Sequence, residues 1–310
     1  MSRILVTGAA GLVGQALLDV AAGHEVLAGD LREPARLPPG ARFERLDVRG
    51  GDAARIVAAF RPDAVVHLAS VVSPPKGSTR ELEYAVDVTG TQNVLCACLD
   101  HGVKRLVVTS SGAAYGYHAD NPVPLTEDDP PRGNAEFAYS HHKRLVEEML
   151  AGARDAHPAL EQAVLRVGTV LGPGLDNQIT ALFRRPRLLA VAGAASPFVF
   201  VWVDDLARIL LRAATGGPPG IFNVAGDGAL TVDDLAARLG KPVLRLPAAL
   251  LKGALALARP LGLSRYGPEQ VRFLQYRPVL DNTRLKETFG YRPEKTSAEA
   301  FDAWRRSVGL

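Results

Sequence analysis

The segment Tyr139-Ser140-His141-His142-Lys143 places a phenol and an amine four residues apart. On a helix this spacing sets both side chains on one face. A free phenol is a poor base near neutral pH, but an ammonium group beside it stabilises the phenolate. Such a pair can take a proton from an alcohol, or give one to a ketone, while a hydride moves. The spacing is common on helices, however, and by itself favours an ordinary surface pair.

A hydroxyl group lies where it could assist this pair. Ser111 stands in the stretch Thr109-Ser110-Ser111-Gly112-Ala113-Ala114-Tyr115-Gly116, just after an apolar run at 105–109 that we expect to be a strand. The carboxyl ends of the strands in a parallel sheet face the ligand crevice. Ser111 is therefore expected to hold the reacting oxygen.

A glycine-rich turn near the start of the chain predicts a second kind of chemistry. Thr7-Gly8-Ala9-Ala10-Gly11-Leu12-Val13-Gly14 follows an expected strand and opens a helix. Gly8 permits the tight turn, Gly11 lets the backbone approach a pyrophosphate, and Gly14 lets the helix pack closely on the strand. The free N–H groups and positive dipole end of the helix suit the phosphates. The pattern indicates a dinucleotide site.

Acidic residues after the next two strands refine this prediction. Asp30 ends the second strand, where a carboxylate accepts hydrogen bonds from the adenosine ribose and repels a 2′-phosphate. We therefore expect NAD as the cofactor. Arg32 stands two residues further on and leaves NADP open. Asp47 and Val48 follow the third strand, where they could meet the adenine edge or form a simple turn.

The elements that must position these residues alternate along the first half of the chain. Runs rich in Val, Ile and Leu without polar alternation are typical of parallel strands buried on both faces. We expect strands at 4–7, 25–28, 43–46, 64–68, 105–109 and 162–166, and helices at 12–22, 52–60, 79–100 and 139–153. This order predicts an α/β fold, a Rossmann-type doubly wound parallel sheet.

The regular order loosens after Gly172, where helices at 204–214, 232–239 and 248–258 and a strand at 221–224 are expected. We therefore predict a dinucleotide-binding domain at 1–171, with a returning strand near 221–224. The remainder, 172–310, is expected to form mainly a smaller C-terminal α/β substrate-binding lobe.

The composition restricts the classes of partner. The 310 residues are 47% hydrophobic and 22% charged, with a formal net charge of +3, which gives no reason to expect nucleic acid. We find no leader segment and no uninterrupted apolar run of membrane-spanning length, so we expect a cytoplasmic protein without a membrane partner. Cys96 and Cys98 are expected to be small buried hydrophobes, and no residues have metal-site spacing.

Taken together, these motifs resemble the extended short-chain dehydrogenase/reductase superfamily, of the NAD-dependent epimerase/dehydratase type. The resemblance runs from residue 3 to about 305. The segments that carry it are TGAAGLVG at 7–14, Asp30, LDV at 46–48, HLAS at 67–70, GTQNVL at 90–95, TSSGAAYG at 109–116, YSHHK at 139–143, LRVGTVLGPG at 165–174, VDDLA at 203–207 and LDNTRLKETFGYRP at 280–293.

The resemblance implies roles for the matched positions. Ser111, Tyr139 and Lys143 would be catalytic, and Lys143 would also bind the nicotinamide ribose. A homodimer through helices near 82–100 and 139–153 is also implied. The expected cofactor-binding set is Gly8, Gly11, Leu12, Val13, Gly14, Asp30, Arg32, Asp47, Val48, Leu68, Ala69, Thr109, Tyr139 and Lys143.

Departures from the family pattern bear on the substrate. The usual asparagine is Asp87, which is expected near the active-site entrance. Nucleotide-sugar epimerases usually carry a diphosphate-clamping arginine where this chain has Phe198, and a histidine where it has Trp202. Gly112-Ala113 replaces the Asp-Glu pair of the 4,6-dehydratases, which makes dehydration an unfavoured reaction. We expect Asp87, Ser111, Phe198 and Arg277 to contact the substrate, with Arg277 meeting an anionic group.

Three functions remain in competition. The first is an NAD-dependent oxidoreductase or epimerase that transfers hydride at a secondary alcohol or ketone of a sugar or nucleotide sugar. The second is a reductase or dehydrogenase of an apolar hydroxy/keto compound, steroid-like or polyketide-like, which Phe198 motivates. The third is a non-catalytic dinucleotide-sensing protein, against which the retained Ser111, Tyr139 and Lys143 count.

Overall fold

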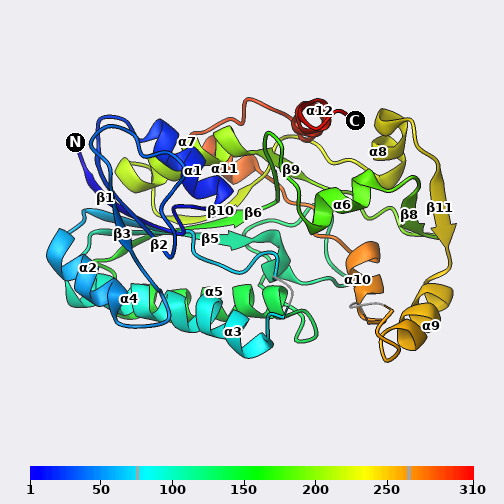
Figure 1. The fold of residues 1–310 in the computed structure, drawn as a ribbon, viewed down its shortest axis with the longest axis horizontal. Coiled ribbons are helices and arrows are strands. Elements are labelled where there is room, and N and C mark those ends of the chain that lie inside the picture. Colours follow the sequence, from blue (N-terminus) through cyan, green and yellow to red (C-terminus); the bar gives the residue numbers. More distant parts are fainter. Residues whose placement is uncertain (75–76, 264–266) are drawn as a thin grey trace.

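A single parallel sheet organises the larger part of the molecule (Figure 1). The structure is a computed structural model that describes residues 1–74, 77–263 and 267–310. The sheet has the strand order β10-β6-β5-β4-β1-β2-β3, with every neighbouring pair parallel. The strands are β1 (Arg3–Thr7), β2 (Glu25–Asp30), β3 (Arg42–Arg45), β4 (Ala64–His67), β5 (Arg105–Ser111), β6 (Glu161–Val167) and β10 (Gly220–Val224).

Helices cover both faces of this sheet, which explains the apolar strands (Figure 1). In β1, Ile4 and Val6 pack into the core on one face and Leu5 into the core on the other. One layer consists of α1 (Leu12–Val20), α7 (Val203–Thr215) and α11 (Thr283–Glu287). The opposite layer consists of α2 (Asp52–Phe60), α4 (Gly90–Asp100) and α5 (Ala138–Ala156). The predicted doubly wound Rossmann-type sheet is confirmed.

A smaller lobe lies at the end of the molecule away from the N-terminus (Figure 1). Its core is aromatic and includes Phe183, Phe200, Phe301 and Trp304. The parallel strand pairs are β7 (Thr169–Leu171) with β9 (Phe200–Trp202) and β8 (Leu188–Val191) with β11 (Val243–Leu246). The helices are α6 (Gln178–Arg184), α8 (Val232–Leu239), α9 (Ala248–Ala258), α10 (Gln270–Gln275) and α12 (Ser297–Ser307).

The lobe and the sheet exchange segments. The elements β10, α7 and α11 all follow residue 172 in the chain, yet they belong to the sheet and to one of its helical layers. The chain therefore returns to the sheet after first entering the lobe. The predicted strand at 221–224 forms the outermost strand, paired with β6.

The predicted helix at 79–100 is wrong as a single regular helix. It divides into α3 (Arg80–Tyr84), a π-helical segment η1 (Ala85–Thr89) and α4. The Thr91 hydroxyl donates to the Asp87 carbonyl oxygen, and such side-chain bonds compete with the regular backbone ladder. A π-helical turn inside a helix is frequent at functional sites. Here it contains Asp87.

The two cysteines differ in exposure. Cys98 is buried, as predicted, but Cys96 is exposed, so that part of the cysteine prediction is wrong. Among the described residues, none of the helices combines the length and the apolar character needed to cross a bilayer.

Candidate active site

The glycine turn between β1 and α1 forms a bare backbone surface. A Cβ added to Gly8, which has a φ of +72°, would lie 2.6 Å from the Ala69 nitrogen, and one added to Gly14 would lie 2.4 Å from the Gly8 oxygen. Gly11 differs, because a Cβ there would meet only the Gly8 oxygen, at 3.3 Å. Gly11 and Leu12 are exposed and open outward. This surface fits the close approach of a pyrophosphate.

Asp30 is held directly beside that turn. Its Oδ2 accepts a hydrogen bond from the Ala10 amide at 2.9 Å, and its Oδ1 accepts one from the Arg32 amide at 3.2 Å. A carboxylate has about four acceptor sites, so capacity remains for ribose hydroxyls. The Arg32 side chain is exposed. The donors and acceptors around the turn therefore fit the adenosine half of NAD.

The next part of the expected path is built from backbone and small side chains. The Leu68 amide donates to the Thr7 oxygen at 3.0 Å, which places Leu68 and Ala69 beside the glycine turn. Asp47 pairs with Arg49 at 2.6 Å, and the hydrogen bond from that guanidinium lowers the pKa of Asp47 to about 2. Val48 is buried and its carbonyl accepts from the Asn93 amide at 2.8 Å. Adenine contacts by Asp47 and Val48 stay a prediction.

The catalytic candidates meet at the carboxyl end of β5. Lys143 is buried, and its Nζ donates to the Thr109 carbonyl oxygen at 2.9 Å. The same Nζ lies 5.4 Å from the centroid of the Tyr139 ring. Ser111, at the end of that strand, accepts from the Ala113 amide at 3.1 Å. The structure thus brings the three predicted residues to one strand end.

Ser140, which follows Tyr139, fixes the start of α5 against the turn after Ser111. That turn is the short helix η2 (Gly112–Tyr115). The Ser140 hydroxyl donates to the Ala113 oxygen at 2.7 Å and accepts from the Asn134 amide at 3.1 Å. This buried contact fixes the position of α5, which carries Tyr139 and Lys143, relative to β5.

His67, the last residue of β4, links β1 to the start of α4. Its Nδ1 lies 2.7 Å from the Thr7 hydroxyl and its Nε2 lies 3.0 Å from the Thr91 hydroxyl. Because the Thr91 hydroxyl donates to the Asp87 oxygen, the ring must donate from Nε2 and accept at Nδ1. Burial lowers the pKa of His67 to about 3, so the ring is neutral. This arrangement gives His67 a structural role, because it fixes Thr7 and Thr91 relative to each other.

The expectation that Asp87 stands at the active-site entrance is wrong. The residue is 2% exposed and lies in the π-helical segment. The carboxylate accepts hydrogen bonds from Ser70, Val71 and His142. His142 is buried beside this carboxylate. An acid that is buried in place of the family's asparagine needs a hydrogen-bond donor. That need is the signal in the sequence that points to His142.

The two remaining substrate candidates come together in the lobe. A cavity of about 690 Å³ is lined by Phe198, Arg277 and side chains that are mostly apolar, among them Leu182, Leu189, Val232, Leu246 and Leu274. The Arg277 guanidinium stacks on the Phe198 ring at 3.8 Å and lies 5.0 Å from the Phe273 ring. Arg185 and Arg187 are exposed at the edge of the same cavity.

Arg277 is an unusual cation. It is 9% exposed, and no carboxylate among the described residues forms an ion pair with it. Its Nη1 donates to the Ser196 carbonyl and hydroxyl oxygens, while its Nε is buried without a hydrogen-bond partner. Burial lowers the pKa of Arg277 to about 9. A buried cation without an anion fits the recognition of an anionic ligand group.

The other aromatic side chains of this region belong to the core. Phe200 is fully buried between Phe198 and Phe301, and Trp202 donates from its indole to Asp204 at 3.1 Å. Of the three aromatic residues at 198, 200 and 202, only Phe198 lines the cavity. In the described part of the chain, no group of three or more His, Cys, Asp or Glu side chains could hold a metal ion.

Comparisons with known proteins agree with this geometry. Residues 4–225 match the model of the family described as "NAD dependent epimerase/dehydratase family". The chain is 29% identical over 320 residues to the UDP-glucose 4-epimerase of Mycolicibacterium smegmatis, covering 96% of this chain and 95% of that protein. It is 27% identical over 316 residues to an uncharacterised protein of Mycobacterium tuberculosis, covering 99% of this chain and 84% of that one.

Solved structures give the same architecture. The crystal structure of Thermus thermophilus UDP-glucose 4-epimerase in complex with NAD has a TM-score of 0.75 at 26% identity and covers 99% of each chain. The Thermotoga maritima UDP-glucose 4-epimerase with UDP-glucose has a TM-score of 0.77 at 23% identity, and the match covers 99% of this chain and 98% of that one. That second likeness concerns the fold alone.

Proposed function

The chain belongs to the NAD-dependent epimerase/dehydratase family, and from that premise we propose that it transfers hydride at a secondary alcohol or ketone of a sugar or nucleotide sugar, as an oxidoreductase or epimerase. One observation carries the proposal. The buried Lys143 donates to the Thr109 carbonyl oxygen of β5, the strand that ends at Ser111, and its ammonium lies over the ring of Tyr139.

The three side chains have separate tasks in this reaction. Tyr139 takes the proton of the substrate hydroxyl, or returns it to the ketone oxygen. The ammonium of Lys143 stabilises the negative charge that develops on the phenol oxygen. The Ser111 hydroxyl donates to the reacting oxygen and keeps it within reach of Tyr139. When bound, the nicotinamide ring of NAD supplies or accepts the hydride.

The glycine turn and Asp30 would hold the cofactor for this chemistry. Gly11 offers open backbone to the pyrophosphate, and the α1 N-terminus supplies N–H groups. Asp30 would accept from the ribose hydroxyls and disfavour a 2′-phosphate, which selects NAD. Lys143 would also donate to the nicotinamide ribose.

The nucleotide-sugar reading is supported by similarity and by one buried charge. The M. smegmatis relative is named a UDP-glucose 4-epimerase, and the match extends over nearly the whole of both chains. Arg277 presents a cation without an anionic partner to the lobe cavity, where a diphosphate would supply the missing charge. The cavity lies in the lobe expected to bind substrate.

A second substrate class is favoured by the wall of the same cavity. Phe198 stands where nucleotide-sugar epimerases usually carry a diphosphate-clamping arginine, and the lining is mostly leucine, valine and phenylalanine. Such a lining suits an apolar hydroxy/keto compound that carries one acidic group for Arg277. This candidate uses the same Ser111, Tyr139 and Lys143 chemistry on a different substrate.

The test is substrate turnover with NAD supplied. UDP-glucose, UDP-galactose and a panel of steroid-like and polyketide-like ketones and alcohols are incubated with the protein, and epimers and NADH are measured. Turnover of a UDP-sugar supports the first candidate, and turnover of an apolar compound alone replaces it by the second. Tyr139→Phe should retain NADH binding and lose about 10²–10⁴ in rate. Unchanged activity in that variant would mean that neither mechanism holds.

Assembly is a separate proposal. We propose a homodimer through α3, α4 and α5, on which Leu82 and Tyr84 are partly exposed apolar side chains, 38% and 43% accessible. These helices form one outer layer of the molecule (Figure 1). Light scattering of the purified chain measures its mass, and a monomer at micromolar concentration would contradict the proposal.

A further inference from the structure

Asp87 joins three segments of the chain at one buried point. Its Oδ1 accepts from the Ser70 hydroxyl at 2.9 Å and from the Val71 amide at 2.8 Å, both in the loop that follows β4. Its Oδ2 lies 3.0 Å from the His142 Nδ1, on α5. The carboxylate itself stands in the π-helical segment. One side chain therefore ties the loop beside the cofactor path to the helix that carries Tyr139 and Lys143.

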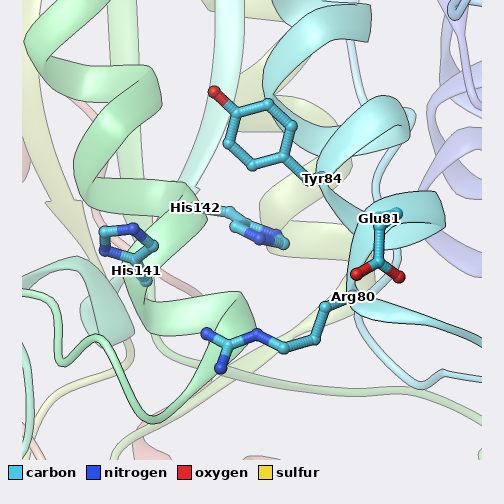
Figure 2. Close-up of a pocket in the computed structure, with 5 residues that line it drawn as sticks. All are labelled: Arg80, Glu81, Tyr84, His141 and His142. Carbon is cyan, nitrogen blue, oxygen red and sulfur yellow. The ribbon is translucent and has the colours of Figure 1, made fainter.

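His142 reaches Asp87 from a confined position. Its side chain is 3% exposed, and the Tyr84 ring meets it edge-on, with the ring centroids 5.5 Å apart. Figure 2 shows His142 in the middle of Arg80, Glu81, Tyr84 and His141, and these five residues line a pocket of about 350 Å³. The burial of the side chain and the contact with Tyr84 hold the ring against the carboxylate.

The charges around Asp87 favour its ionised form. Burial opposes the charge most strongly, but the hydrogen bond from His142, the nearby ammonium of Lys143 and the bonds from Val71 and Ser70 together lower the pKa of Asp87 below its usual value. The groups that face the pair are Lys143 and His141 on α5, Tyr84, Arg80 and Glu81 on α3, and the neutral His67 on β4. Asp87 is thus an anion near neutral pH.

We propose that His142 is a positioning residue for the reaction: by donating to Asp87 it keeps that acid anionic, and the anion locks the catalytic helix and Lys143 to the loop beside the cofactor path. The inference rests on the proposed function. An asparagine at position 87, as the family usually has, would hold the loop without a charge and would not need His142. Asp87 and His142 therefore act together as one hydrogen-bonded pair.

Removal of His142 has a consequence that depends on pH. In His142→Leu the Asp87 Oδ2 is buried without a donor, so the folded-state pKa of Asp87 rises above its unfolded value. A group with a raised folded pKa binds more protons when folded, so stability falls as pH rises through that pKa. At low pH the neutral acid is tolerated. At high pH the uncompensated anion loosens the loop and helix that border the cofactor.

The experiment compares wild type, His142→Leu, His141→Leu and Asp87→Asn/His142→Leu by NADH fluorescence titration and by thermal unfolding between about pH 5.5 and about pH 8. The expected NADH dissociation constant of His142→Leu is within about twofold of wild type at low pH and about tenfold weaker at high pH. Its melting-temperature deficit should widen over the same range by about 2–4 °C. His141→Leu, altered one residue away, should follow wild type.

The double variant identifies the titrating group. With asparagine at position 87 the pH dependence caused by His142→Leu should disappear from both measurements. The proposal is overturned if the losses of NADH affinity and melting temperature in His142→Leu do not change with pH. It is also overturned if the double variant shows the same pH dependence. If wild type fails to bind NADH at any pH, the proposed function fails, and thermal unfolding still decides whether the two residues are coupled.

Discussion

Replacement of Gly11 by alanine is expected to preserve folding and to remove most of the affinity for NADH. Gly11 has a φ of −75° and a ψ of 169°, ordinary extended backbone, and its added Cβ would meet only the Gly8 oxygen, at 3.3 Å. That contact is tight for a Cβ, and Gly11 is the N-cap of α1, where alanine is less favourable than glycine, so the free energy of unfolding should fall by no more than about 1 kcal/mol. In the complex the methyl would stand where the pyrophosphate approaches the backbone. Loss of one or two hydrogen bonds there, about 1–3 kcal/mol, weakens binding about 10- to 100-fold.

Gly14 and Gly152 provide the comparison variants for Gly11→Ala. A Cβ at Gly14 would lie 2.4 Å from the Gly8 oxygen and 2.6 Å from the Ala9 oxygen, and backbone atoms cannot give way as a side chain would. The clash costs about 1–3 kcal/mol, which exceeds the gain of up to about 1 kcal/mol from helix propensity. Gly152, on α5, has no atom within 4 Å of an added Cβ, so Gly152→Ala should gain about 0.5–1 kcal/mol.

The measurements are urea unfolding monitored by circular dichroism and NADH titration monitored by fluorescence. Gly11→Ala should lose NADH binding with little change in stability. Gly14→Ala should lose both stability and NADH binding, and Gly152→Ala should lose neither. If Gly11→Ala binds NADH with the wild-type constant, the pyrophosphate does not lie on this turn. If it unfolds as readily as Gly14→Ala, the reasoning from the Cβ distances is refuted.

Three further predictions concern buried groups. Glu147→Gln should lower the free energy of unfolding by about 3–5 kcal/mol, because its partner Arg166, at 2.7 Å, is left charged and 3% exposed. Glu148→Gln, in an exposed ion pair, should change the free energy of unfolding by less than about 1 kcal/mol. Urea unfolding measures both variants. Arg277→Met should raise the stability of the ligand-free protein by about 1–2 kcal/mol and abolish any rise in melting temperature caused by UDP, and a retained UDP effect would count against an anion site at Arg277. A thiol reagent should modify Cys96 in the native protein and spare Cys98, whose pKa burial raises to about 12, as peptide mass spectrometry would report.

Much of the sheet could be predicted because its strands are buried on both faces. Val and Leu at successive positions of β1, β4 and β5 leave no alternative to a covered parallel sheet, and the structure confirms it. Boundaries moved by one or two residues, as at β3, which begins at Arg42 and ends at Arg45. The strand pairs of the lobe were missed, because three- and four-residue strands such as β8 carry too little pattern.

The site was predictable where one residue type is required by geometry. Gly8 needs a positive φ and Gly14 needs the absence of a Cβ, and these demands are visible in a sequence. Asp87 was misplaced because its direction depends on a π-helical turn that helical periodicity does not reveal. The link between Asp87 and His142 joins residues 55 positions apart, and only the packing of two helices brings them together.

The return of β10 to the sheet restricts how this protein can be divided. Leu206, Ile209 and Leu210 of α7 belong to the core on one face of the sheet, and β10 completes the hydrogen bonding of β6. A fragment that ended at residue 171 would leave β6 as an open edge and expose one side of β4 and β5 to water. Expression of the nucleotide-binding half alone should therefore yield aggregates. Fusion partners and affinity tags are better attached at the chain ends than between the lobes.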